Sequence, residues 1–157
     1  RTQGLLNKGV QTAGNIFAQG KVPETEIESI IRAEIEKYRI KFKDSEEGFI
    51  KRWPTSYDIQ GWLICMKSGG ELAPHMHEKG WISGSIYIKV PPKSETNSGN
   101  LVLCLGDQGH VLDTEQSIID VVTGSFCLFP SSLHHYTVPF EGKDERIVLA
   151  FDVIPKI

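Results

Sequence analysis

Hydrophobic and polar positions change their spacing along the chain at about residue 53. Between Glu24 and Phe42 the apolar residues recur in steps of three and four, which is the period of one face of an α-helix. This stripe consists of Ile27, Ile30, Ile31, Ile35, Tyr38 and Phe42. Pro23 and the capping-box sequence Thr25-Glu26-Ile27-Glu28 mark its predicted start. We therefore expect an amphipathic helix that packs on a sheet, preceded by an ordered arm at 1–20 that has no sustained period.

Beyond Trp53-Pro54 the chain consists of short apolar runs separated by Gly, Pro, Asn or Asp. Runs of this length and residue type predict β-strands, and their turn signals are those of antiparallel connections. The predicted strands are Trp62–Lys67, Leu72–His77, Ser83–Val90, Asn100–Leu105, Ser117–Val122, Ser125–Phe129, His134–Pro139 and Arg146–Ile154. The pattern is typical of a mainly β fold, an antiparallel jelly roll of two sheets, with the N-terminal helix packed on the sheet.

Length and composition limit the classes of protein to consider. With 157 residues, 39% of them hydrophobic, the chain is long enough for one core and short for two. We expect a single domain over 1–157, with the arm and helix in 1–50 and the jelly-roll core in 51–157. A net charge of -3 and a pI near 6.0 argue against nucleic-acid binding. Apolar runs such as 118–122 are far shorter than the roughly 20 residues that cross a bilayer, so we expect no membrane span.

The cysteines indicate a reducing compartment. Cys65, Cys104 and Cys127 each lie in an apolar run, and no two of them form a C-x-x-C pair. Buried free thiols are the expected state, which favours a cytoplasmic location. The chain begins at Arg1 without a leader, so we expect a processed chain or a domain of a longer protein. The sequence leaves a homo-oligomer open.

Two histidine clusters are the strongest chemical signal in the sequence. His75 and His77 are two residues apart, so on an extended strand both imidazoles point to the same face. A third imidazole from a distant strand would complete one face of a metal site and leave other positions open, as in non-haem Fe(II) centres. Those centres normally use two histidines and one carboxylate. Glu78 is the nearest acid, but it alternates with His77 and should point to the opposite face.

The second cluster, His134-His135, offers one ligand at most. Adjacent residues of a strand point to opposite faces, and the residues alone do not decide between the two imidazoles. The remaining histidine, His110, lies in a glycine-rich segment and is expected at the surface.

Arg146 stands at the entry of an apolar strand and has two interpretations. It is either a surface residue paired with Asp144 or Glu145, or a guanidinium at the mouth of a barrel that binds a ligand carboxylate with two hydrogen bonds. Tyr87 is either an ordinary core tyrosine or a second donor to the same carboxylate.

The same residues carry a resemblance that covers nearly the whole chain. The first signature comprises Gly61-Trp62, His75-Met76-His77-Glu78-Lys79-Gly80-Trp81-Ile82-Ser83-Gly84, Tyr87 and Val90-Pro91. The second comprises Gly124-Ser125, Leu128-Phe129-Pro130-Ser131-Ser132-Leu133, His135, Thr137-Val138-Pro139-Phe140 and Glu145-Arg146-Ile147. Together they resemble a family of 2-oxoglutarate- and Fe(II)-dependent oxygenases whose members often stand alone or follow tetratricopeptide repeats. Aspartyl/asparaginyl β-hydroxylases are more distantly similar.

The resemblance implies a fold, a cofactor and a reaction. The fold would be a double-stranded β-helix, which is cupin-like, with Fe(II) bound by His75, His77 and His135. A two-histidine site with water in the third position is the other reading. Arg146, with Tyr87, would hold the 2-oxoglutarate carboxylate. The reaction would be oxidative decarboxylation of 2-oxoglutarate with O₂, coupled to hydroxylation of a primary substrate that the sequence does not identify. No catalytic residue beyond the metal centre is expected.

Two other functions remain open from the sequence. A cupin-like metal protein that does not use 2-oxoglutarate could employ the same histidines and would not need Arg146. Alternatively, the barrel could be a binding module that has lost iron and uses Ile27, Ile31 and Tyr38 as an interface. A serine hydrolase is not supported, because the segment 80–84 lacks the spacing of a nucleophile elbow.

Overall fold

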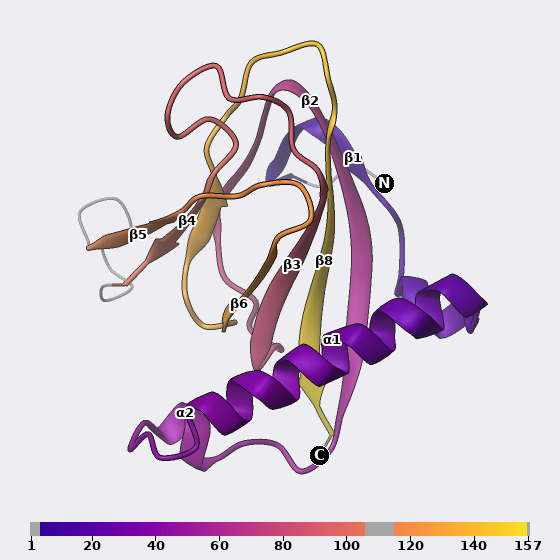
Figure 1. The fold of residues 1–157 in the computed structure, drawn as a ribbon, viewed down its shortest axis with the longest axis vertical. Helices are drawn as coiled ribbons and strands as arrows, with labels where there is room; N and C mark the ends of the chain where they lie inside the picture. The colour runs from indigo at the N-terminus through magenta and orange to yellow at the C-terminus, as the bar shows by residue number, and fades with distance from the viewer. Residues whose placement is uncertain (1–3, 106–114, 157) are drawn as a thin grey trace.

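A computed structural model describes residues 4–105 and 115–156 of the chain. Two helices and a short 3₁₀ turn lie in the first third, and a large sheet forms the rest (Figure 1). The elements are β1 (Leu6–Gln11), η1 (Ile16–Gln19), α1 (Val22–Lys41), α2 (Gly48–Lys51), β2 (Tyr57–His75), β3 (Ile82–Lys89), β4 (Leu101–Cys104), β5 (Gln116–Ile119), β6 (Phe126–Pro130), β7 (His135–Thr137) and β8 (Arg146–Pro155). His110, expected at the surface, lies outside the described residues.

The sheet is antiparallel and curled, as expected for a jelly roll. Its strand order is β5-β4-β7-β2-β8-β3-β6, and β1 pairs with β2 beside this path. Strand β2 connects the two sides of the curl: its first part pairs with β8 and its last part with β7. Gly69, which has a φ of 72°, allows β2 to bend between these parts, and its N–H donates to Phe140 O. The predicted strands at 62–67 and 72–77 are therefore one long bent strand, which ends at His75.

Alternation along β8 separates the core from an interior cavity. Leu149, Phe151 and Val153 are buried in the cluster that also contains Ile31 and Ile35 of α1. Figure 1 shows α1 lying across β2, β3 and β8. The residues that alternate with them line the cavity on the other side of the sheet: Arg146, Val148, Ala150 and Asp152. The expected packing of the helix on the sheet is confirmed, and the same strand builds both layers.

The helix differs from the prediction at its start and along its stripe. It begins at Val22 rather than near Glu24, because Pro23 fits the first turn and Glu24 accepts a hydrogen bond from the Lys21 N–H (3.3 Å). The capping box predicted at 25–28 was wrong. Ile30 is 56% exposed, so the packed stripe is narrower than predicted.

Two elements escaped the sequence analysis. Strand β1 lies in the arm, where only Leu6 of its six residues is buried, and an edge strand of this kind carries no full alternation. The four residues of α2 are too few to show a helical period. Conversely, β5 ends at Ile119, earlier than predicted, and β7 has only three residues.

Two expectations from composition can be compared with the described residues. Cys65, Cys104 and Cys127 are all free thiols, as predicted. Burial raises the pKa of Cys127 to about 11. In the part of the chain that the structure covers, no helix is both long and apolar enough to cross a membrane.

Candidate metal centre

Strand pairing brings the two histidine clusters together. His75, the last residue of β2, is the direct cross-strand partner of His135 in β7. Their ring centroids are 4.3 Å apart. His77 lies beyond the end of β2, so the predicted strand Leu72–His77 ends earlier than expected, at His75. Its position is fixed instead by its backbone N–H, which donates to Ser131 O (3.0 Å). The turn still directs His77 toward the other two rings, at centroid distances of 5.1 Å and 5.0 Å.

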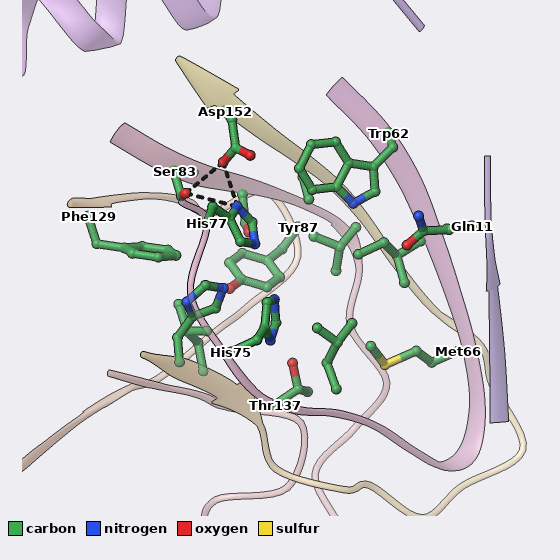
Figure 2. A pocket seen from close by; sticks show the side chains of 18 of the residues that line it. Gln11, Trp62, Met66, His75, His77, Ser83, Tyr87, Phe129, Thr137 and Asp152 are labelled. Carbon is green, nitrogen blue, oxygen red and sulfur yellow. Dashed lines mark hydrogen bonds and ion pairs between the residues drawn. The ribbon is translucent and has the colours of Figure 1, made fainter. Parts of the chain in front are cut away.

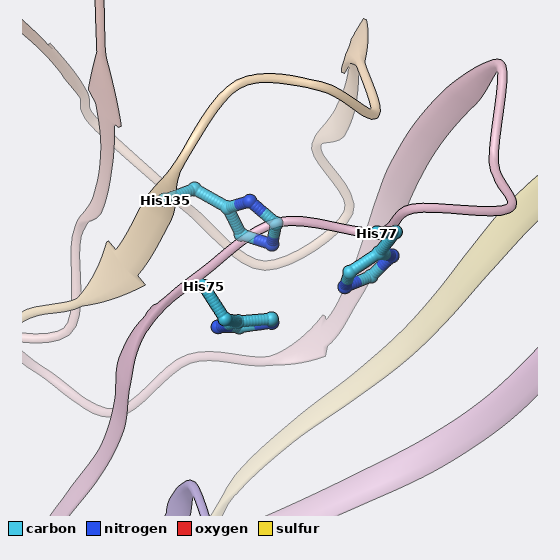
Figure 3. A group of neighbouring side chains, drawn as sticks. All are labelled: His75, His77 and His135. Atoms are coloured by element: carbon cyan, nitrogen blue, oxygen red, sulfur yellow. The ribbon is translucent and has the colours of Figure 1, made fainter. Parts of the chain in front are cut away.

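The three imidazoles converge on one point (Figure 3). One ring nitrogen from each of His75, His77 and His135 lies within 4.8 Å of the others. A bond from imidazole nitrogen to a metal such as Zn²⁺ is about 2.0–2.1 Å, so small ring rotations would bring all three nitrogens to one cation. Within the described ranges, no carboxylate joins this group. Glu78 is exposed, in agreement with the expectation that it points away, and His134 is not part of the cluster.

The hydrogen bonds of the rings show which nitrogen is available to a metal. Nδ1 of His75 lies 2.7 Å from Ala73 O, and Nδ1 of His135 lies 3.0 Å from Leu133 O. Nδ1 of His77 lies 2.7 Å from Asp152 Oδ1. Carbonyl and carboxylate oxygens accept hydrogen bonds, so each Nδ1 carries the proton and each Nε2 keeps its lone pair. This is the arrangement expected of metal-binding histidines, and the donor set therefore fits a divalent transition metal.

Burial keeps the His75 and His135 rings neutral. Desolvation, followed by repulsion from His75, lowers the pKa of His135 to about 3. Desolvation also lowers the pKa of His75, and its hydrogen bond to Ala73 opposes this only in part. Neutral imidazole is the form that binds a metal, so the site does not have to release protons from these two rings near neutral pH.

Arg146 is buried in the same cavity. It is 3% exposed, which excludes the surface interpretation. Among the described residues its Nε has no hydrogen-bond partner, whereas Nη1 lies 4.0 Å from Met66 Sδ and the guanidinium also interacts with the Tyr87 side chain. Among residues 4–105 and 115–156, no Asp or Glu forms an ion pair with Arg146. Burial lowers the pKa of the guanidinium, and Tyr87 partly opposes the shift.

Tyr87 is both a core residue and a residue of the cavity wall. It is 1% exposed and belongs to a hydrophobic cluster, yet it also lines the cavity. Its ring lies under the guanidinium of Arg146, with the Arg146 Cζ 5.3 Å from the ring centroid. Desolvation raises the Tyr87 pKa to about 12, so its hydroxyl remains a hydrogen-bond donor at physiological pH.

One cavity of about 300 Å³ contains all of these groups. Figure 2 shows His75, His77 and Tyr87 directed toward this space, which Trp62, Met66 and Thr137 also line. Apolar and polar side chains contribute about equally to its lining, so the cavity offers several converging polar groups to a small molecule. Of the three tryptophans only Trp62 lines it, whereas Trp53 and Trp81 pack around the core under α1.

Asp152 is the site residue that the sequence analysis missed. It is 8% exposed and contacts His77, as the dashed lines in Figure 2 show. A signal was present in the predicted strand at 146–154. Asp152 is the lone acid within that apolar run and is six residues from Arg146, which places both on the same face.

Comparisons with known proteins agree with the fold and with the chemistry of the donor set. A family model described as "Putative 2OG-Fe(II) oxygenase" matches residues 60–152, which include all three histidines and Arg146. No curated protein matches the sequence at a significant level.

Several solved structures share the fold at low sequence identity. A prolyl-4-hydroxylase from Pseudomonas putida is similar over 95% of this chain and 72% of its own, with a TM-score of 0.61 at 14% identity. A viral collagen prolyl hydroxylase from Paramecium Bursaria Chlorella virus-1 is similar over 98% and 83%, with a TM-score of 0.59 at 14% identity. HygX from Streptomyces hygroscopicus, solved with nickel and 2-oxoglutarate bound, is similar over 99% and 73%, with a TM-score of 0.59 at 9% identity.

Proposed function

Because the chain belongs to the 2OG-Fe(II) oxygenase family, whose members use Fe(II) and 2-oxoglutarate, we propose that it hydroxylates a C–H bond of an organic substrate. When bound, the iron and the oxoacid supply the oxidation: 2-oxoglutarate and O₂ yield succinate and carbon dioxide, and one oxygen atom enters the substrate. The protein supplies binding, orientation and a cavity with few water molecules.

In this proposal the three histidines bind iron through Nε2. His75 and His135 are held by backbone carbonyls at the ends of paired strands, so strand register sets their positions. His77 is held by a side chain. Three protein ligands on one side leave the opposite side of the metal open to the cavity, as a reaction of O₂ with two organic molecules requires.

The single observation that carries the proposal is the buried guanidinium of Arg146, which shares the cavity with the histidines and has no carboxylate partner among the described residues. A buried cation without a carboxylate partner is costly, and it becomes favourable when an anionic ligand supplies the missing partner. Guanidinium matches a carboxylate with two parallel hydrogen bonds. A dicarboxylate that chelates the metal with its oxoacid end would place its other carboxylate at such a group, and Tyr87 would add a hydroxyl donor.

Two aromatic rings of the lining pack against the proposed metal ligands. Phe129 packs edge-on against His135, with centroids 4.8 Å apart, and Trp62 lies 5.8 Å from His77. These rings cover part of the imidazole surface beside the proposed metal position. A low-dielectric wall strengthens the attraction between Arg146 and the bound carboxylate.

An anaerobic titration of the metal-free protein with Fe(II) and 2-oxoglutarate tests the proposal. We expect a visible charge-transfer band that needs both additions, because it reports the oxoacid chelated to iron. The band should vanish in His135→Ala, which lacks one ligand, and should need far more 2-oxoglutarate in Arg146→Met. If the protein binds Fe(II) but gives no band with 2-oxoglutarate, the proposed function is wrong.

A further inference from the structure

Only one of the three candidate metal ligands is supported by a charged group. His75 and His135 each donate Nδ1–H to a backbone carbonyl two residues earlier in the chain. His77 donates instead to the carboxylate of Asp152, which lies 75 residues away on β8, at 2.7 Å. His77 also occupies the position, two residues after the first histidine, where a two-histidine-one-carboxylate centre has its acid.

The carboxylate is held in place by a buried network. Ser83 Oγ lies 2.6 Å from Asp152 Oδ1 and 2.9 Å from Ser131 Oγ. Because a carboxylate can only accept, Ser83 donates to Asp152 and accepts from Ser131. Ser83 is 2% exposed and Ser131 is fully buried. Strand pairing places Ser83 directly opposite Asp152, so the contact is set by the β3–β8 register.

The turn that carries His77 is fitted closely to this network. The N–H of His77 donates to Ser131 O, and the N–H of Ser131 donates to Trp81 O. A Cβ on Gly80 would collide with Ser131 Oγ, so the turn can approach only with glycine at this position. The backbone and the side chain of His77 are thus both fixed, although His77 lies outside any strand.

No other cation neutralises this buried acid. Over the described residues, His77 is the only basic side chain within ion-pair distance of Asp152, at 2.7 Å. The negative charge of Asp152 is therefore balanced through the His77 imidazole, by a metal cation bound to the Nε2 of that ring.

We propose that Asp152 is a positioning residue that fixes the His77 ring with Nε2 toward the metal and places negative charge directly behind that ligand. Two-histidine-one-carboxylate centres bind the carboxylate directly to the iron. In this chain the carboxylate lies behind His77 and acts through its imidazole. A carboxylate hydrogen-bonded to a metal-binding imidazole fixes its tautomer and increases its basicity. The inference rests on the proposed function only in requiring that the three histidines bind a divalent metal.

Anaerobic titration with Co(II) alone, followed by its visible absorption, tests this role without requiring turnover. We expect Asp152→Asn to weaken Co(II) binding by about 10- to 100-fold, the usual effect of removing such a partner. The matched control is Asp144→Asn, which removes an exposed acid paired with Lys89 and should change the affinity less than twofold. Thermal unfolding of the metal-free variants serves as the folding control.

A second comparison separates positioning from general structural support. In the His77→Asp background the ligand is itself a carboxylate, so Asp152 becomes a nearby like charge rather than a hydrogen-bond partner. We expect His77→Asp/Asp152→Asn to bind Co(II) as tightly as His77→Asp or more tightly, the reverse of the effect in the parent. If Asp152→Asn alone does not fold, the double variant still decides: weaker Co(II) binding than in His77→Asp would overturn the inference.

The outcomes are distinct. If a folded Asp152→Asn binds Co(II) as the parent does, or if the substitution weakens binding equally in both backgrounds, Asp152 does not act through His77 and the inference is overturned. If the parent protein binds no Co(II), the proposed metal centre and this inference fail together. A parent that binds Co(II) but gives no 2-oxoglutarate-dependent band with Fe(II) would contradict the proposed reaction and leave the role of Asp152 intact.

Discussion

Replacing Arg146 with methionine should affect the ligand-free protein and its complex in opposite directions. In the free protein Nε is buried without a partner, a state that costs about 1–3 kcal/mol. The contact with the Tyr87 ring, at 5.3 Å, returns about 0.5–2 kcal/mol. Methionine retains an unbranched apolar side chain without the charge. The two opposing contributions therefore predict that Arg146→Met keeps or slightly raises the free energy of unfolding, with a gain on the order of 1 kcal/mol.

The same substitution should weaken the binding of 2-oxoglutarate. Removing one partner of a buried charge pair costs about 2–5 kcal/mol, which corresponds to a roughly 30- to 4,000-fold weaker affinity for 2-oxoglutarate. The loss is large because the ligand carboxylate would then lie in an apolar cavity with Tyr87 as its remaining donor.

Thermal unfolding of Ni(II)-loaded protein with and without 2-oxoglutarate measures both effects. Nickel permits the measurement in air, since no turnover is needed. At a ligand concentration 100 times its Kd, the parent should gain about 2.7 kcal/mol, or roughly 5–11 °C in Tm for a chain of this size. Arg146→Met, whose affinity is at least about 30-fold weaker, should gain no more than about 0.9 kcal/mol at that concentration. The exposed Arg52→Met should behave as the parent does. A destabilised Arg146→Met that still gains the full shift with 2-oxoglutarate would refute the reasoning.

Three further predictions concern the ligand charge, the packing and the thiols. His77→Asp makes the metal site one charge less positive, so 2-oxoglutarate should bind more weakly in an anaerobic titration with Fe(II); unchanged binding would contradict the charge argument. A Cβ on Gly84 would overlap the buried Phe151 ring, so Gly84→Ala should lower the free energy of urea unfolding by about 1–3 kcal/mol. Gly48→Ala meets open space and should have little effect, and equal losses in the two variants would count against the packing explanation. With its pKa raised to about 11, Cys127 stays protonated as the pH rises to 8, so its thiolate fraction there is about 200-fold below that of an ordinary cysteine. Iodoacetamide at pH 8 should therefore modify Cys127 slowly in the native protein and rapidly in urea, a contrast that peptide mass spectrometry can measure, and equal rates would contradict the shift.

Much of the fold was predictable because it depends on short-range pattern. The stripe containing Ile31 and Ile35 identified α1, and short apolar runs separated by turn residues identified most strands of the sheet. Strand β1 was missed because an exposed edge strand lacks that alternation, and its pairing with β2 depends on residues about 60 positions away. Helix α2 was missed because a single turn has no measurable period.

The sequence by itself determined the fold class, the histidine clusters and the presence of an arginine suited to a carboxylate. These are properties of residue type and local spacing, and they do not depend on how distant segments of the chain pair. Residue type and spacing left three matters to the tertiary structure: that His135 rather than His134 lies beside His75, that Arg146 is buried with no acidic partner among the described residues, and that Asp152 supports His77. Each depends on cross-strand register and on the curl of the sheet, which bring together residues 60 to 80 positions apart. Local periodicity carries no information about such contacts, because a shift of one residue in register would reverse which face every side chain occupies.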